Sequence, residues 1–137
     1  MLEKRLSSAL DILRNYQPIA VYLFGSRAGD SPRSDSDVDI AILLPQGRRI
    51  PLSEKMDLAA KLEATLEQEV DLVILNEARL TLQFEIIQTG KLLYESSRDE
   101  RTDAEDRIVR DYLDFEPLLE QSFKEIAEEA RGGVPPV

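Results

Sequence analysis

The chain has 137 residues, a length that suits one domain with a single core. It contains no cysteine and no histidine, which excludes disulfides, thiolate nucleophiles, Cys/His zinc sites and an imidazole general base. The net charge of −10 argues against nonspecific nucleic-acid binding, because that depends on Lys and Arg neutralising phosphates. A small nucleotide carried with a divalent metal, or a basic protein partner, is compatible with it.

Hydrophobic periodicity predicts a helix and two strands in the first third of the chain. Residues 2–15 carry apolar side chains at helical spacing, and Pro18 follows as a break. The near-continuous apolar run over residues 19–24 predicts a strand that is buried on both faces. The polar stretch 27–36 predicts a turn or short helix followed by a loop, and residues 38–44 predict a second buried strand.

In the middle of the chain, predicted helices and strands alternate. Ser53 is the predicted N-cap of a helix whose leucines recur at helical spacing. Residues 70–75 predict a third strand and residues 77–89 a helix that ends at Gly90. A short edge strand is expected over residues 92–94. The order predicts an α/β (α+β) fold with a small mixed sheet of about three or four strands and flanking helices.

A long helical pattern over residues 99–130 follows, and Pro117 should kink or divide it. We therefore expect a domain over residues 1–97, a C-terminal helix or helix pair over 98–130 and a disordered tail over 131–137. The apolar stripe of this segment either packs on its own domain or covers a partner, and the pattern leaves both open. The N-terminus lacks a secretory core and no apolar run approaches the ~20 residues of a membrane span, so a cytoplasmic location is expected.

Three carboxylates carry the chemistry that the sequence suggests. Asp37 and Asp39 stand two residues apart at the start of a predicted strand, so they share one face. Two carboxylates on one face can share Mg²⁺, a cation that prefers oxygen ligands. If the strand containing Asp71 pairs beside that of Asp39, the three converge and could hold two metals for in-line displacement at phosphorus. Without histidine, Asp71 is also the natural general base, or else the metal ligand that delivers the activated hydroxyl.

The end of the first strand offers a phosphate site. Gly25 permits close approach of the backbone, and Ser26 adds a hydroxyl donor. A strand that turns here into a helical segment presents free N–H groups to an anion. Arg27 follows and could pair with phosphate oxygens, although a surface salt bridge is an equally good explanation of it.

Gly25-Ser26, ten intervening residues and Asp37-Val38-Asp39 resemble the GS-X10-DXD signature of the DNA polymerase β-like nucleotidyltransferase superfamily. Asp71 falls where the third carboxylate of that superfamily is expected, on a following strand. The small size resembles the minimal nucleotidyltransferases (MNT). In many bacteria and archaea these are antitoxins paired with a HEPN-domain ribonuclease toxin. The resemblance covers roughly residues 18–95.

This resemblance implies a polymerase β-like fold and a defined activity. Gly25 and Ser26 would hold the triphosphate, and the three carboxylates would bind Mg²⁺, with two ions expected. The superfamily transfers a nucleoside monophosphate from a nucleoside triphosphate to a hydroxyl. In the antitoxin branch ATP is the usual donor, and the acceptor is a tyrosine hydroxyl on the HEPN toxin.

Two other functions fit the same residues. The chain could neutralise its partner by binding alone, with a vestigial site, because an intact motif does not prove turnover. It could also modify a small molecule of the aminoglycoside type. The lack of a substrate-holding domain in this chain disfavours that second alternative, although a dimer could build the pocket.

Overall fold

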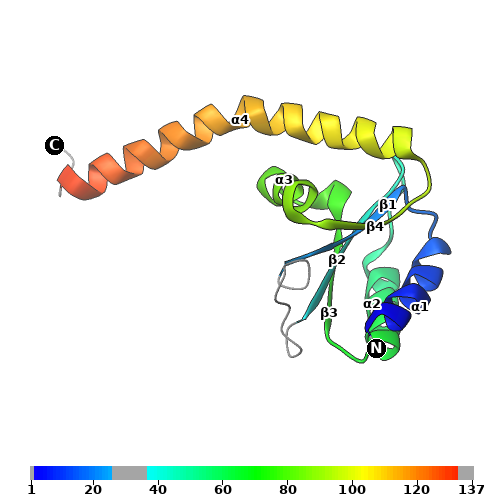
Figure 1. The fold of residues 1–137 in the computed structure, drawn as a ribbon. Helices are drawn as coiled ribbons and strands as arrows, with labels where there is room; N and C mark the ends of the chain where they lie inside the picture. The colour runs from blue at the N-terminus through cyan, green and yellow to red at the C-terminus, as the bar shows by residue number, and fades with distance from the viewer. Residues whose placement is uncertain (1, 26–36, 133–137) are drawn as a thin grey trace.

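The structure, a computed structural model, describes residues 2–25 and 37–132. Its centre is a four-stranded sheet with the strand order β3-β2-β1-β4 (Figure 1). The strands are β1 (Ala20–Phe24), β2 (Val38–Leu43), β3 (Val70–Ile74) and β4 (Lys91–Glu95). β1 is antiparallel to both β2 and β4, whereas β2 and β3 are parallel. This mixed sheet confirms the predicted fold class, and β4 lies at an edge as expected.

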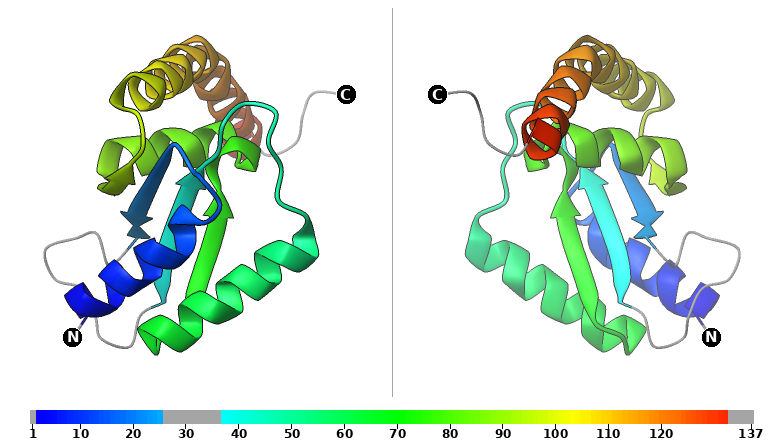
Figure 2. Two further views of the ribbon diagram at one scale, coloured as in Figure 1. Left: turned by 90° about the vertical axis from the view of Figure 1, so that its right-hand side faces the viewer. Right: turned by 90° about the vertical axis from the view of Figure 1, so that its left-hand side faces the viewer.

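Helices flank the sheet on both faces. They are α1 (Leu2–Arg14), α2 (Leu52–Leu66), α3 (Leu80–Thr89) and α4 (Arg98–Gly132). Figure 2 shows α4 lying over α3, at the end of the molecule away from α1 and α2. No helix in the described part of the chain is both long and apolar enough to cross a membrane.

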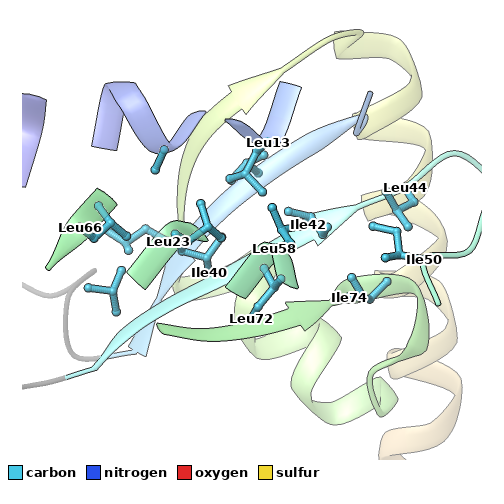
Figure 3. Packing of buried hydrophobic residues seen from close by; sticks show 14 residues of the cluster. Leu13, Leu23, Ile40, Ile42, Leu44, Ile50, Leu58, Leu66, Leu72 and Ile74 are labelled. Carbon is cyan, nitrogen blue, oxygen red and sulfur yellow. The ribbon is translucent and has the colours of Figure 1, made fainter. Parts of the chain in front are cut away.

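The larger core lies between the sheet and the helices α1 and α2. Alternate residues of β2 point to this face, beginning with Val38 and Ile40, and both are almost fully buried. Leucines from one stripe of α2 meet them, because residues three to four apart share a helix face. The α2 leucines are Leu58, Leu62 and Leu66. Figure 3 shows Leu58 and Leu66 in this core together with Ile40 of β2.

A second core fills the other face, under α3 and α4. The remaining residues of β2 point this way, and Ala41 and Leu43 pack against Ile86 of α3 and Ile108 of α4. Because β2 is covered on both faces, its sequence is a continuous apolar run after Asp39. The two cores therefore hold β2 in a fixed position, and Asp39 lies near the start of that strand.

Two predicted boundaries need correction. Ser53 is not the N-cap of α2, because the helix begins at Leu52 and Pro51 occupies the capping position without a side-chain hydrogen bond. The extended backbone of Pro51 sets the start of the helix instead, and its carbonyl accepts a hydrogen bond from the N–H of Lys55. The helix predicted from residue 77 begins at Leu80, since a 3₁₀ turn, η2 (Leu75–Glu77), comes first.

The two halves of α4 have different environments. α4 runs as one helix through Pro117. The proline leaves one carbonyl of the preceding turn without its N–H partner, and solvent can reach that turn because Leu113 is exposed. Before the proline, Ile108 is buried and Tyr112 stacks on Phe84 of α3, with ring centroids 3.9 Å apart. Beyond the proline the helix extends past α3 (Figure 1).

A polar network ties the first half of α4 to the sheet. The hydroxyl of Tyr22, in the middle of β1, donates to Oε2 of Glu105 at 2.6 Å. Arg101 donates to the other oxygen of Glu105 at 3.0 Å and also pairs with Glu95 at the end of β4. Burial, followed by the hydrogen bond to Glu105, raises the pKa of Tyr22 far above its usual range, so the phenol stays protonated and remains a donor. Tyr22 and Glu105 are 83 residues apart in the chain, so no local sequence pattern predicts their hydrogen bond.

We expect Tyr22→Phe to lower the free energy of unfolding by about 1–2 kcal/mol, because it leaves a part-buried carboxylate with one donor fewer. Urea denaturation of both proteins measures the difference. Tyr16→Phe is the matched control, since the hydroxyl of Tyr16 makes no hydrogen bond to any residue that the structure describes. Equal losses for the two variants would contradict a role for the Glu105 hydrogen bond.

Candidate active site

Two of the predicted carboxylates meet where β2 and β3 begin. In the parallel register of these strands, Asp39 lies directly opposite Asp71. Neighbouring strands are about 4.8 Å apart, so the two side chains leave adjacent backbone positions. The predicted pairing of the two strands is thus confirmed. Asp37 precedes Asp39 by two residues, just before β2 begins.

The strand alternation places Asp39 and Asp71 on one face of the sheet. Asp39 is in phase with Ala41, which belongs to the core under α3 and α4, and Asp71 is in phase with Val73 of the same core. Their intervening neighbours, such as Ile40, point into the opposite core. Both carboxylates therefore lie on the α3–α4 face, beyond the apolar part of that core.

Gly25 lies beside the Asp39 carboxylate. It follows β1 directly, and Phe24 before it pairs with Asp39 across the antiparallel ladder. Gly25 has a φ of +73°, a left-handed conformation that side chains other than glycine rarely adopt. A methyl group built on it would lie 3.0 Å from Cγ of Asp39 and would overlap the carboxylate oxygen Oδ2. The missing side chain of Gly25 thus makes room for the Asp39 carboxylate.

Like charges and burial act together on Asp39. Burial raises the pKa of Asp39, and the nearby negative charges of Asp71 and then Asp37 raise it further. Both neighbours influence Asp39 at this range, so the three carboxylates share one electrostatic environment. Ionised Asp39 therefore has an unfavourable interaction that a bound cation would relieve.

The donor set suits a divalent cation such as Mg²⁺, which prefers carboxylate oxygens. Asp39 is half-buried, whereas Asp37 and Asp71 are exposed and have room to turn toward an ion. As the side chains stand, no three carboxylates within residues 2–25 and 37–132 already enclose a metal position. The predicted phosphate ligands Ser26 and Arg27 lie outside the described residues.

The raised pKa of Asp39 predicts how this residue affects stability with pH. The folded chain keeps the Asp39 proton at pH values where the unfolded chain has lost it, so ionisation of Asp39 lowers the free energy of unfolding. That loss develops as the pH rises from the ordinary value of 3.8 through the raised pKa. At pH values above the raised pKa of Asp39, we expect Asp39→Asn to have a larger free energy of unfolding than the wild type. The difference between the two proteins should shrink as the pH falls. Urea denaturation between pH 3 and pH 7 tests this, and a gap that widens toward acid would contradict it.

A separate hollow of about 600 Å³ opens at the other end of β2, beside Leu44 and the loop after it. Asn76 fixes that loop by donating to the carbonyl of Leu44 and accepting from its N–H. Arg48 and Arg49 line this hollow and not the carboxylate site. Arg48 donates to the carbonyls of Tyr16 and Gln17 after α1, which is a structural role. The size of this hollow does not make it the candidate site, because the converging carboxylates lie elsewhere.

Comparison with known proteins agrees with the observed fold. A parallel strand pair with facing aspartates, beside an antiparallel strand followed by glycine, is the arrangement expected from the resemblance to nucleotidyltransferases. The family model described as "Polymerase beta, Nucleotidyltransferase" matches residues 8–99, which include every predicted site residue. The chain belongs to the polymerase β nucleotidyltransferase family, and the predicted superfamily is confirmed.

One relative with an assigned activity is similar to part of this chain. The protein adenylyltransferase MntA of Shewanella oneidensis is 34% identical over 80 residues, which cover 58% of this chain and 56% of that protein. This match therefore spans little more than half of the relative's length.

Two crystal structures share the fold. A toxin–antitoxin structure with AMP-PNP is 24% identical, with a TM-score of 0.78 over 93% of this chain and 99% of that chain. A structure of the MNT antitoxin with the tri-AMPylated HEPN toxin of Shewanella oneidensis is 22% identical, with a TM-score of 0.77 over the same shares. At these identities the two structures establish the polymerase β-like fold of this chain and no more.

Proposed function

We propose that this chain is a Mg²⁺-dependent antitoxin that transfers AMP from ATP to a tyrosine hydroxyl of a cognate HEPN-family toxin in the cytoplasm. The observation that carries the proposal is the register of β2 and β3, which sets Asp71 opposite Asp39, with Gly25 packed on Asp39. The relative named protein adenylyltransferase MntA supports the type of transfer. The complexes of an MNT antitoxin with an AMPylated HEPN toxin support the type of partner.

Each site residue has a role in this reaction. Asp37, Asp39 and Asp71 would hold Mg²⁺, which supplies positive charge against the triphosphate when it is bound. Gly25 keeps the backbone close to Asp39, and we assign Ser26 and Arg27 to the phosphates. Asp71 is exposed on an edge strand, and we assign it the role of accepting the proton of the attacking hydroxyl. The tyrosine oxygen forms a bond to the α-phosphorus, the bond from that phosphorus to the bridging oxygen breaks, and pyrophosphate leaves.

The test is to incubate the protein with its cognate HEPN toxin, ATP and Mg²⁺ and to measure the intact mass of the toxin. We expect the mass to rise by one or more adenylyl groups, and peptide mapping to place them on tyrosine. Replacing ATP by each other nucleoside triphosphate measures the donor preference, and EDTA measures the need for metal. An unmodified toxin in a mixture where the two proteins bind would refute transfer and favour neutralisation by binding alone.

A further inference from the structure

The end of α4 carries an apolar surface that its own domain leaves uncovered. We call residues 113–131 the arm and the apolar side chains along one side of it the stripe. The stripe consists of Phe115, Leu119, Phe123 and Ile126, whose spacing of three or four residues places them on one helix face. Phe123 and Ile126 are 62% and 61% exposed, and Leu118 adds apolar surface beside them. Large apolar side chains that gather on one exposed face are typical of interaction surfaces.

The stripe continues the face by which α4 packs on its own domain. Ile108 and Tyr112 precede Phe115 at the same spacing, and they contact the core and α3. The helix then extends past α3 (Figure 1), and the exposed fraction of the stripe is 37% at Phe115 but 62% at Phe123 and 61% at Ile126. A single helix thus has one half anchored to the sheet and one half presented outward.

Charge on the arm indicates what can cover the stripe. The arm carries six carboxylates against two basic side chains. On a helical projection Glu116 flanks one side of the stripe, and Glu125 and Glu129 flank the other. Two arms from two copies of this chain would bring these carboxylates together, which is unfavourable. A partner whose apolar groove is bordered by Lys and Arg would instead gain from the same charges.

We propose that the arm is the docking element for the protein substrate, and that its stripe seats in an apolar helical groove of the toxin that is bordered by basic residues. This rests on the proposed function, because it names the surface by which the transfer site holds its acceptor. An amphipathic helix in a groove is a common mode of protein recognition. Docking through the arm would raise the local concentration of the acceptor tyrosine near Asp39 and Asp71.

The experiment measures binding of the cognate HEPN toxin to the full chain without ATP, by surface plasmon resonance. We expect Phe123→Ala/Ile126→Ala to raise Kd by about tenfold or more, since exposed aromatic and aliphatic anchors dominate such interfaces. The matched control is Leu52→Ala/Met56→Ala on α2, where the side chains are 71% and 64% exposed. The control should leave Kd unchanged, and circular dichroism should show both variants folded, because alanine favours helices.

Kinetics separate this inference from the proposed function. If AMP is transferred, the arm variant should raise the KM for the toxin and leave kcat within about twofold. A tight complex that the arm variant weakens, with no transfer, would support docking and refute the proposed activity. Transfer with unchanged Kd and KM in the arm variant would refute docking alone. Sedimentation of the chain by itself gives a further check, because a dimer that the arm variant dissociates would overturn our choice of occupant.

Discussion

Asp39→Asn is expected to reduce the rate of AMP transfer by about a thousandfold or more, while the chain stays folded. Gly25 leaves room for the Asp39 carboxylate, and the negative charges of Asp71 and Asp37 act on it. Asp39 is therefore central to the proposed metal site. A metal ligand of this type contributes several kcal/mol to stabilising charge in the transition state, and about 1.4 kcal/mol corresponds to a factor of ten in rate. Asparagine keeps the size of the side chain and removes the charge. Single-turnover transfer to the toxin, followed by mass spectrometry, measures the effect.

The control for this change is Asp57→Asn, which neutralises an exposed carboxylate on α2. It alters the net charge equally and should leave the rate within about twofold, because surface charges away from a site act weakly. Thermal unfolding should show that Asp39→Asn is folded at neutral pH. An Asp39→Asn protein that transfers AMP at a rate close to that of the wild type would refute the assignment of the active site.

Gly25→Ala is expected to reduce transfer by at least about a hundredfold and to destabilise the chain. The left-handed backbone alone costs a side chain about 1–2 kcal/mol. In addition, the new methyl group would overlap Oδ2 of Asp39 and push the carboxylate out of position. A displacement on the order of 1 Å at a catalytic group can cost about a hundredfold in rate. Transfer kinetics and urea denaturation measure the two effects separately.

Gly47→Ala is the matched control, because Gly47 has a φ of +85° but nothing within 4 Å of the added methyl group. It should cost a similar 1–2 kcal/mol through the backbone and leave the rate of transfer unchanged. The comparison isolates the contact with Asp39 from the strain of a left-handed residue. If both variants lost activity equally, the loss would come from destabilisation and not from the position of the carboxylate.

The position of α4 connects the site to the proposed docking surface. Its first half is bonded to Tyr22 in the centre of β1, and that strand ends at Gly25 beside Asp39. Its second half carries the exposed stripe. The same helix therefore carries the proposed partner surface and is attached to the strand that leads to the candidate active site. The network of Tyr22, Glu105 and Arg101 holds this attachment at a defined place.

Much of the fold could be predicted from the sequence because the relevant signals are local. The apolar runs that become β1 and most of β2 are short and continuous, as expected for strands covered on both faces. The candidate aspartates stood out for the same reason, since charged residues at the edge of an apolar run are conspicuous. Local signals were weaker at helix starts, where Pro51 and not Ser53 precedes α2.

By itself, the sequence indicated a type of chemistry. Without histidine or cysteine, acid–base work is left to carboxylates, Lys, Tyr or bound water, and Gly25 and Ser26 before Asp37 and Asp39 at a fixed spacing suit a phosphate and a cation. Only the tertiary structure decided that Asp71 lies opposite Asp39, that Gly25 contacts Asp39, and that α4 is divided between the core and solvent. The register of two strands separated by a helix depends on how both cores pack, and no local spacing encodes that packing.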